Sequence, residues 1–304
     1  MSNENVHKKN KEELLMKQKV GFIGLGVMGQ SMAKHILQAG YSLSVYTRTK
    51  EKAEDLIKLG AVWMDSISGL ANECEIIITM IGYPKDVEEV YLGENGIVSS
   101  AKPGTYVIDM TTSQPSLAKK IYEQAKLKDI YSLDAPVSGG DIGAREARLA
   151  IMVGGDKEAF DFCLPLFEKM GQNIVYQGEA GSGQHTKMCN QIAIASGMIG
   201  VCEAISYAKK SGLEPENVLK SITTGAAGSW SLSNLAPRML ADDFEPGFFI
   251  KHFIKDMGIA LDESNTMNLY TPGLELAHQL YEKLAEAGFE DKGTQALVKL
   301  WEEI

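Results

Sequence analysis

The sequence predicts an α/β fold in which a doubly wound parallel sheet is followed by an all-helical C-terminal region. Up to about residue 180, short apolar runs rich in β-branched residues alternate with segments of helical periodicity. Strand, helix and strand repeated in this way specify a parallel sheet with helices on its faces. After residue 180, nearly every segment as far as Ile304 has helical period, which indicates a second, helical domain.

Each element follows from its own pattern. Helical patterns such as MGQSMAKHILQAG and PSLAKKIYEQAK separate the expected strands. The segment EAGSGQ (179–184) precedes a long apolar helix that begins near Gly183, so we predict a sheet domain at 19–180 and an all-helical domain at 181–304. Residues 1–18 are polar and charged, without the apolar core of a secretion signal, and we predict a disordered extension there. The seven expected strands are residues 20–25, 43–46, 75–81, 105–110, 130–137, 149–155 and 173–178.

Composition excludes several classes of partner. The chain of 304 residues has a formal net charge of −10, which would repel nucleic acid phosphates and anionic lipid, so a small molecule is the expected partner. The longest charge-free part of the long helix, 188–202, is shorter than the roughly 18 residues of a membrane span. The four cysteines show no CxxC and no zinc spacing, so we expect buried free thiols, a cytoplasmic location and no metal.

The first chemical motif is the turn Gly24-Leu25-Gly26-Val27-Met28-Gly29. It follows the first expected strand and opens a helix, which is the context that a Rossmann-type dinucleotide site requires. Gly24 permits the tight turn, Gly26 lets the backbone approach a pyrophosphate, and Gly29 lets helix and strand pack closely. A purely structural turn and a methyltransferase-type loop are the alternatives.

The end of the second expected strand bears on the choice of dinucleotide. An NAD site usually offers an acidic residue about 20 residues past the glycines, whereas this chain has Tyr46-Thr47-Arg48-Thr49. Arg48 can form charge-assisted bonds with a 2′-phosphate, and Thr47 and Thr49 can donate hydroxyls. This favours NADP over NAD, although a solvated arginine at a helix start would look the same.

Three further motifs carry polar residues. Asp134-Ala-Pro-Val-Ser138-Gly139-Gly140 ends a strand, and its serine and consecutive N–H groups suit a carboxylate, although a plain loop would also explain the glycines. Lys187 and Asn190 lie three residues apart at the start of the long helix and therefore share a face. Lys255 lies in FIKHFIKD. Either lysine could instead be solvated, with its stem along apolar surface.

These motifs, in this order, resemble the β-hydroxyacid dehydrogenase family, and the resemblance extends from Lys19 onward. It implies that the turn 24–29 binds the cofactor and that Ser138, Gly139 and Gly140 bind the substrate carboxylate. It also implies that Lys187 is the catalytic acid/base. Asn190 and Lys255 correspond to the family's substrate-binding asparagine and lysine.

The resemblance also adds cofactor contacts. Thr112, in Asp109-Met-Thr111-Thr112, corresponds to a segment near the nicotinamide, and Lys255 would lie near the cofactor as well as the substrate. We place Met80 and Ile81, at the end of the run 75–81, among the cofactor-binding residues. The expected reaction interconverts a small β-hydroxy acid and its semialdehyde acid, with NADP preferred and NAD possible.

The sequence departs from the family at His35 and Gln191, where many relatives have asparagine, and in the segment 143–149 beside the substrate loop. These departures put the substrate's identity in doubt. A non-catalytic dinucleotide-binding module and an imine reductase-type relative are the alternatives, and both would be expected to lack a lysine at position 187. Because the long helix has little polar surface, we expect a homodimer or homotetramer formed through the helical domains.

Overall fold

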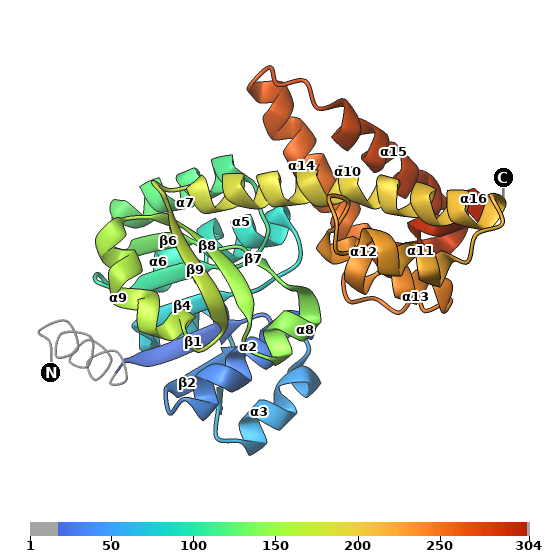
Figure 1. Ribbon diagram of the computed structural model, residues 1–304. Helices are drawn as coiled ribbons and strands as arrows, with labels where there is room; N and C mark the ends of the chain where they lie inside the picture. The colour runs from blue at the N-terminus through green and yellow to red at the C-terminus, as the bar shows by residue number, and fades with distance from the viewer. Residues whose placement is uncertain (1–17, 303–304) are drawn as a thin grey trace, which may run out of the picture. The chain divides into compact units, whose positions relative to one another are not determined.

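The computed structural model describes residues 18–302, and the predicted disorder of the N-terminal extension falls almost entirely outside this range (Figure 1). The chain divides into two compact units, Met1–Lys187 and Met188–Ile304. The division falls within the first turns of helix α10 (Ser182–Lys210).

The first unit contains a nine-stranded sheet. Its strand order is β3-β2-β1-β4-β5-β6-β8-β7, and β9 also pairs with β8. The order reverses between β1 and β4, and at such a point an open α/β sheet binds its ligand outside the carboxyl ends of the strands. The strands are β1 (Lys19–Ile23), β2 (Ser42–Tyr46), β3 (Val62–Trp63), β4 (Ile76–Thr79), β5 (Tyr106–Asp109), β6 (Tyr131–Asp134), β7 (Val137–Ser138), β8 (Leu149–Gly155) and β9 (Gly171–Gly178).

The α/β class with a helical C-terminal part is confirmed, but the sheet differs from the expectation in three respects, one of which is the short strand β3, which was not expected. Strands β1 to β6 are parallel, but β8 runs antiparallel to β6 and β7, so the sheet is mostly rather than wholly parallel. The expected strand 130–137 is broken at Ala135 and Pro136 into β6 and β7. Proline cannot donate a ladder hydrogen bond, which accounts for the break.

Helices cover both faces of this sheet (Figure 1). On β4, Ile76 and Ile78 pack with one core cluster, whereas Ile77 packs with the other. This alternation is the two-residue period of a strand buried on both sides. The helices of the first core cluster are α2 (Val27–Gln38), α3 (Glu54–Lys58), α8 (Gly140–Arg145) and α9 (Lys157–Phe167). Those of the other are α4 (Ile67–Glu73), α5 (Pro84–Leu92), α6 (Ile97–Ser100) and α7 (Pro115–Lys126).

The second unit is built from the rest of α10, from Met188 onward, and from shorter helices, around a single apolar core. Phe253 and Tyr281 lie at its centre with their rings edge to face, 5.1 Å apart, and both are fully buried. The helices after α10 are α11 (Pro215–Ile222), α12 (Trp230–Asn234), α13 (Ala236–Leu240), α14 (Ile250–Thr266), α15 (Pro272–Leu284), the turns η2 (Ala285–Phe289) and η3 (Thr294–Val298), and α16 (Lys299–Glu302).

Helix α10 is the longest in the described chain and its most apolar long helix. Among the described residues it is the one helix that, by length and composition alone, could cross a membrane. The share of its apolar window that is buried inside the protein is 44%. Met198 and Ile205 lie on this buried side, in the core of the second unit. The helix therefore buries one side in this core and leaves other residues of the same window exposed.

Candidate functional site

The glycine-rich turn between β1 and α2 is tightly closed at two of its glycines. Gly24 has a φ of +98°, and a Cβ there would lie 2.3 Å from the carbonyl oxygen of Met80. A Cβ on Gly29 would lie 1.9 Å from the carbonyl oxygen of Gly24. Because no side chain fits at either position, only glycine lets β1, α2 and the end of β4 meet here.

The remaining glycine leaves open space in front of α2. Gly26 is the N-cap of the helix, and a Cβ there would meet nothing within 4 Å. No side chain caps the first turn and no acidic residue lies in it, so its N–H groups and the positive end of the helix dipole are available to an anion. Leu25 is buried in the core, Met28 is half-buried and Val27 is exposed. The turn therefore fits a pyrophosphate, with Leu25 able to contribute only its backbone.

The residues after β2 differ in their exposure. Thr47 is buried, Thr49 is exposed, and the side chain of Arg48 is 83% exposed. Arg48 Nη1 lies 3.5 Å from Oδ1 of Asp86, in the first turn of α5. Exposed pairs of this kind contribute little and are easily exchanged, so the arginine can turn to another anion. Asp86 is a neighbour that sequence reasoning missed, because the two residues come from different βα connections.

Buried hydrogen bonds join the ends of β4 and β5, where Met80, Ile81 and Thr112 were predicted to meet the cofactor. Asp109 Oδ1 accepts bonds from the Thr79 hydroxyl at 2.8 Å and from the backbone N–H of Thr111 at 3.1 Å. The Thr111 hydroxyl accepts from the backbone N–H of Ile81 at 2.9 Å. Met80, Ile81 and Thr112 are half-buried. These bonds place both segments at the same edge of the sheet as the glycine-rich turn.

The serine-glycine segment turns sharply after β7. Ser138 is half-buried and pairs with Ala150 of β8. Gly139 and Gly140 have φ values of +129° and +63°, a left-handed geometry that residues with a Cβ rarely adopt. The turn leads directly into α8, so consecutive backbone N–H groups follow the serine, as the carboxylate-binding prediction requires.

His35, in α2, forms hydrogen bonds with the end of α8, the helix that follows the serine-glycine segment. Its Nε2 lies 3.0 Å from the carbonyl oxygens of both Ala144 and Arg145, at the end of α8. These are terminal helix carbonyls, which commonly need a partner from outside the helix. His35 is one of the positions at which the sequence departs from the family pattern. The structure gives it a role in holding α8 against α2.

Lys187 lies near the start of α10 and is only 7% exposed. The start of this helix packs on the backbone of the sheet: a Cβ on Gly183 would lie 2.4 Å from the carbonyl oxygen of Met152 and 2.5 Å from that of Asp134. This contact explains why a glycine stands at position 183, in the first turn of the helix. Lys187 is therefore a buried lysine on a helix whose start packs on the sheet.

In the second unit, four polar side chains form a connected group. Asn190 donates a 2.7 Å bond to Oε1 of Gln191, whose own amide donates a 2.6 Å bond to Oδ2 of Asp256. Lys255 Nζ lies 2.8 Å from Oδ1 of the same carboxylate, in an ion pair. Burial, with the neighbouring Lys255, lowers the pKa of His252. The predicted residues Asn190 and Lys255 thus belong to one cluster, joined by Gln191 and Asp256.

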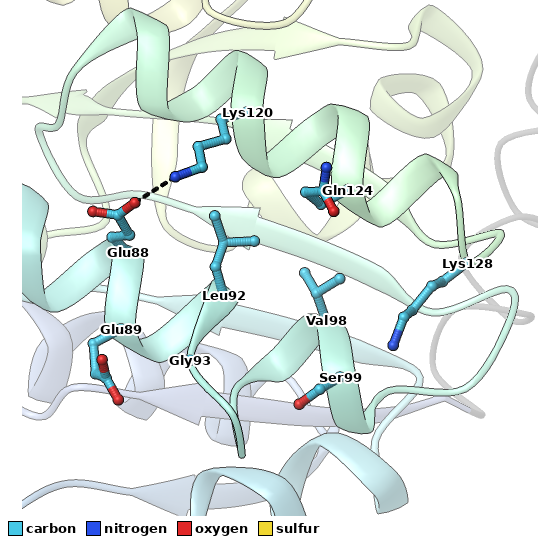
Figure 2. Close-up of a pocket in the computed structure, with 9 residues that line it drawn as sticks. All are labelled: Glu88, Glu89, Leu92, Gly93, Val98, Ser99, Lys120, Gln124 and Lys128. Carbon is cyan, nitrogen blue, oxygen red and sulfur yellow. Dashed lines mark hydrogen bonds and ion pairs between the residues drawn. The ribbon is translucent and has the colours of Figure 1, made fainter.

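The chain also has surface pockets away from the predicted residues. Figure 2 shows one of about 450 Å³ between α5, α6 and α7, across which Lys120 Nζ and Glu88 Oε1 pair at 2.6 Å. None of the predicted site residues lines it. Within residues 18–302 no cluster of His, Cys, Asp or Glu has the arrangement of a metal site. Three of the cysteines are buried as expected, but Cys189 is exposed.

A sheet with a glycine-rich turn at its reversal point and an uncapped helix behind that turn is the arrangement of a dinucleotide-binding domain. Comparison with known proteins identifies the chain as an NAD(P)-dependent oxidoreductase and gives its family. Residues 19–178 match the NAD binding domain of 6-phosphogluconate dehydrogenase. Residues 181–301 match the NAD-binding domain of NADP-dependent 3-hydroxyisobutyrate dehydrogenase. The chain belongs to the β-hydroxyacid dehydrogenase family, whose members include 3-hydroxyisobutyrate dehydrogenase.

Individual relatives cover nearly the whole chain. An uncharacterized oxidoreductase of Bacillus subtilis, YkwC, is 69% identical over 94% of this chain and 99% of its own length. The 2-hydroxy-3-oxopropionate reductase of Escherichia coli is 38% identical over 93% of this chain and 97% of its own. Among solved structures, the 3-hydroxyisobutyrate dehydrogenase of Mycobacterium tuberculosis with L-serine is 30% identical, with a TM-score of 0.86 over 93% of this chain and 98% of that one.

Proposed function

We propose that the protein is an NADP-preferring dehydrogenase that interconverts a small β-hydroxy acid and its semialdehyde acid, with Lys187 as the proton donor and acceptor. The observation that supports the proposal is the burial of Lys187 near the start of α10, where Gly183 packs on the backbone of the sheet. Lysine is among the residue types least often buried, so a buried lysine at the head of this helix is a candidate for a functional group. The E. coli and M. tuberculosis relatives are named for substrates of this class, small carboxylic acids with an oxygen function at C3.

The substrate carboxylate would bind at the segment 138–140. The Ser138 hydroxyl and the N–H groups that follow Gly139 would bind one carboxylate together, because consecutive N–H groups in a turn with positive φ suit an anion. This fixes one end of a three- or four-carbon acid and so fixes where its carbon C3 lies. Asn190 and Lys255 remain proposed contacts of the same substrate.

Hydride transfer to or from C3 is the chemistry that a bound nicotinamide supplies. In the reducing direction the carbonyl oxygen gains negative charge, and the Lys187 ammonium would donate the proton that converts it to a hydroxyl. In oxidation the neutral amine would take that proton back. A positioned donor of this kind contributes roughly 10²–10⁴-fold to the rate.

NADP preference rests on the end of β2. The described segment 46–49 holds no carboxylate to bind a ribose 2′-hydroxyl, and the exposed Arg48 forms a weak pair with Asp86. A 2′-phosphate carries more negative charge than the carboxylate of Asp86 and can bind the guanidinium of Arg48 with two hydrogen bonds. The family match of residues 181–301 to an NADP-dependent enzyme supports the same preference.

We also propose a cytoplasmic homodimer or homotetramer that binds neither nucleic acid nor membrane. The net charge of −10 disfavours polyanionic partners. On α10, Ser196, Gly197 and Gly200 are exposed, and they form a small-residue face on which another helix can pack closely. Several large apolar residues of the second unit are exposed as well: Met267, Leu269, Tyr270 and Leu276. Exposed apolar surface of this kind supports self-association.

The test is a substrate panel with both cofactors. Small semialdehyde acids and β-hydroxy acids would be assayed at saturating NADP(H) and NAD(H), following absorbance of the reduced nicotinamide. The proposal expects turnover of at least one acid of this class with a higher kcat/KM for NADP(H). Turnover restricted to imines or amines, or none at all with intact cofactor binding, would contradict it.

A further inference from the structure

The side-chain amide of Gln184 joins the start of α10 to the segment that follows β5. Gln184 is completely buried and lies three residues before Lys187. Its Nε2 donates a 2.7 Å hydrogen bond to the carbonyl oxygen of Thr111. Its Oε1 accepts a 2.9 Å bond from the backbone N–H of Ser113. One side chain therefore binds the backbone on both sides of Thr112, the residue expected near the nicotinamide.

Asp134 fixes the same helix start from the neighbouring strand. Its Oδ1 accepts a 2.8 Å bond from the N–H of Gly181, and its Oδ2 accepts a 2.8 Å bond from the N–H of Gln184. A carboxylate in this place satisfies N–H groups that the helix itself cannot pair and lies at the positive end of the helix dipole. The backbone of Gln184 is thus held by β6, while its side chain is held by the segment after β5.

These bonds constrain Lys187 directly. Residues three apart on a helix share a face, so α10 cannot slide or rotate enough to move Lys187 without breaking the bonds of Gln184. A displacement of about 1 Å at a reacting group can lower the rate roughly a hundredfold. Both glutamine bonds are buried, where hydrogen bonds are least readily replaced by water.

We propose that Gln184 is a positioning residue: its amide sets the distance and rotation of the Lys187 helix relative to the segment 111–113, and so relative to the nicotinamide. The proposal rests on the proposed role of Lys187 as acid/base. The role needs a donor and an acceptor on one planar group, because Thr111 offers a carbonyl and Ser113 an N–H. An amide has this arrangement, and so does a protonated carboxyl, but an ionised carboxylate lacks the donor.

The first experiment is a double-mutant cycle with Lys187. Gln184→Met should lower kcat about a hundredfold. KM for NADP should change far less than kcat, because the turn 24–29 and Arg48 are untouched and Thr112 is only one of the proposed cofactor contacts. If Gln184 acts through the lysine, the same change made in Lys187→Met should lower the remaining kcat less than about threefold. An equal loss in both backgrounds would overturn the proposal.

The same cycle distinguishes failure of the acid/base role of Lys187 from failure of the positioning role of Gln184. If Lys187→Met alone keeps most of its turnover, the acid/base assignment fails whatever the glutamine does. If Lys187→Met is inactive and Gln184→Met is not impaired, the assignment stands and the positioning role fails.

The second experiment uses the isosteric Gln184→Glu, which also covers the possibility that Gln184→Met does not fold. When the introduced carboxyl is protonated, it can donate to Thr111 and accept from Ser113, as the amide does. When it is ionised, it repels the Thr111 carbonyl. The ratio of variant to wild-type kcat should therefore rise as pH falls, with the folded fraction checked by circular dichroism at each pH. A ratio that does not change with pH would overturn the proposal.

Gln295 provides a matched control. It is 1% exposed, and its amide donates to the backbone carbonyls of Asp243 at 2.9 Å and Glu245 at 3.2 Å. Gln295→Met removes a buried amide of the same kind that bonds to no predicted site residue. It should lower the unfolding free energy comparably while leaving kcat within about twofold of wild type. A hundredfold loss of kcat in this variant would show that loss of any buried amide impairs turnover, and the positioning role would be refuted.

Discussion

The amide of Gln191 donates a 2.6 Å hydrogen bond to Oδ2 of Asp256, and both side chains are almost completely buried. Gln191 also accepts from Asn190, so it connects a proposed substrate contact to a buried carboxylate that pairs with Lys255. Position 191 departs from the family pattern, and the structure shows what the longer amide does there. It spans from α10 to α14 within the second unit.

Gln191→Leu should therefore destabilise the protein and weaken substrate binding together. Loss of the amide leaves Oδ2 of Asp256 without this donor, which costs about 1–3 kcal/mol of unfolding free energy. It also removes the acceptor of Asn190, so KM for the acid should rise more than kcat falls. Denaturant unfolding and steady-state kinetics measure the two effects. Gln191→Asn, which keeps an amide on a shorter stem, should be intermediate; normal kinetics in Gln191→Leu would contradict this account.

Arg48→Asp should shift cofactor use from NADP toward NAD. The 2′-phosphate would meet a like charge in place of a charge-assisted donor, a loss of about 1.5–3 kcal/mol or roughly ten- to a hundredfold in KM. Steady-state kinetics with both cofactors measure the shift.

Asp86→Ala is the matched variant. It removes the carboxylate that lies 3.5 Å from Arg48 and should lower KM for NADP modestly. A wild-type protein that already prefers NAD would contradict both expectations.

Asp134 should make stability depend on pH in a defined window. Burial raises the pKa of its carboxyl from 3.8 to about 6. Between these pH values the folded protein binds more protons than the unfolded chain. Protonation of Asp134 therefore stabilises the folded protein fully below about pH 4, and this stabilisation is lost as pH rises through 6. Because a pKa shift of one unit corresponds to about 1.4 kcal/mol, the unfolding free energy should change by at most roughly 3 kcal/mol across this range.

The measurement is denaturant unfolding of wild type and Asp134→Asn between pH 4 and 7. The unfolding free energy of wild type relative to the variant should fall across this range. If it rises instead, the two backbone N–H bonds outweigh burial and hold the pKa of this carboxyl below its ordinary value.

Gly197→Arg should dissociate the proposed oligomer. Gly197 is exposed on α10 with open space around its Cα, so the change is tolerated within one chain, but it places a charged side chain on the small-residue face. Analytical ultracentrifugation should show a dimer or tetramer for wild type and a smaller species for the variant. A wild-type monomer at micromolar concentration would contradict the assembly.

Sequence periodicity predicted most of the sheet, because buried parallel strands are continuous apolar runs bounded by turn residues. The two-residue strand β3 was missed, since Val62 and Trp63 carry too short a pattern to be distinguished from a loop. The direction of β8 was also missed. It depends on how the chain turns through Gly139 and α8, which apolar periodicity does not encode.

Motif spacing predicted the glycine-rich turn, the serine-glycine segment and the lysine helix, because each lies within one short stretch of sequence. Asp86, His35 and Gln184 could not be assigned a role in this way. Gln184 bonds to residues 71 and 73 positions away, and His35 to residues 109 and 110 positions away. Such contacts follow from the three-dimensional fold and have no local pattern.

The measurement that tests the central claim most directly is kcat of Lys187→Met, together with its affinity for NADP. Methionine keeps a four-atom stem, with sulfur in place of one methylene, and lacks the amine, so fold and cofactor affinity should be retained. If Lys187 is the acid/base, kcat should fall by about 10²–10⁴-fold on the best substrate. A variant that binds NADP normally and keeps more than about a tenth of wild-type turnover would contradict the assignment, since replacement of a lysine outside the chemistry can change stability but leaves kcat nearly unchanged.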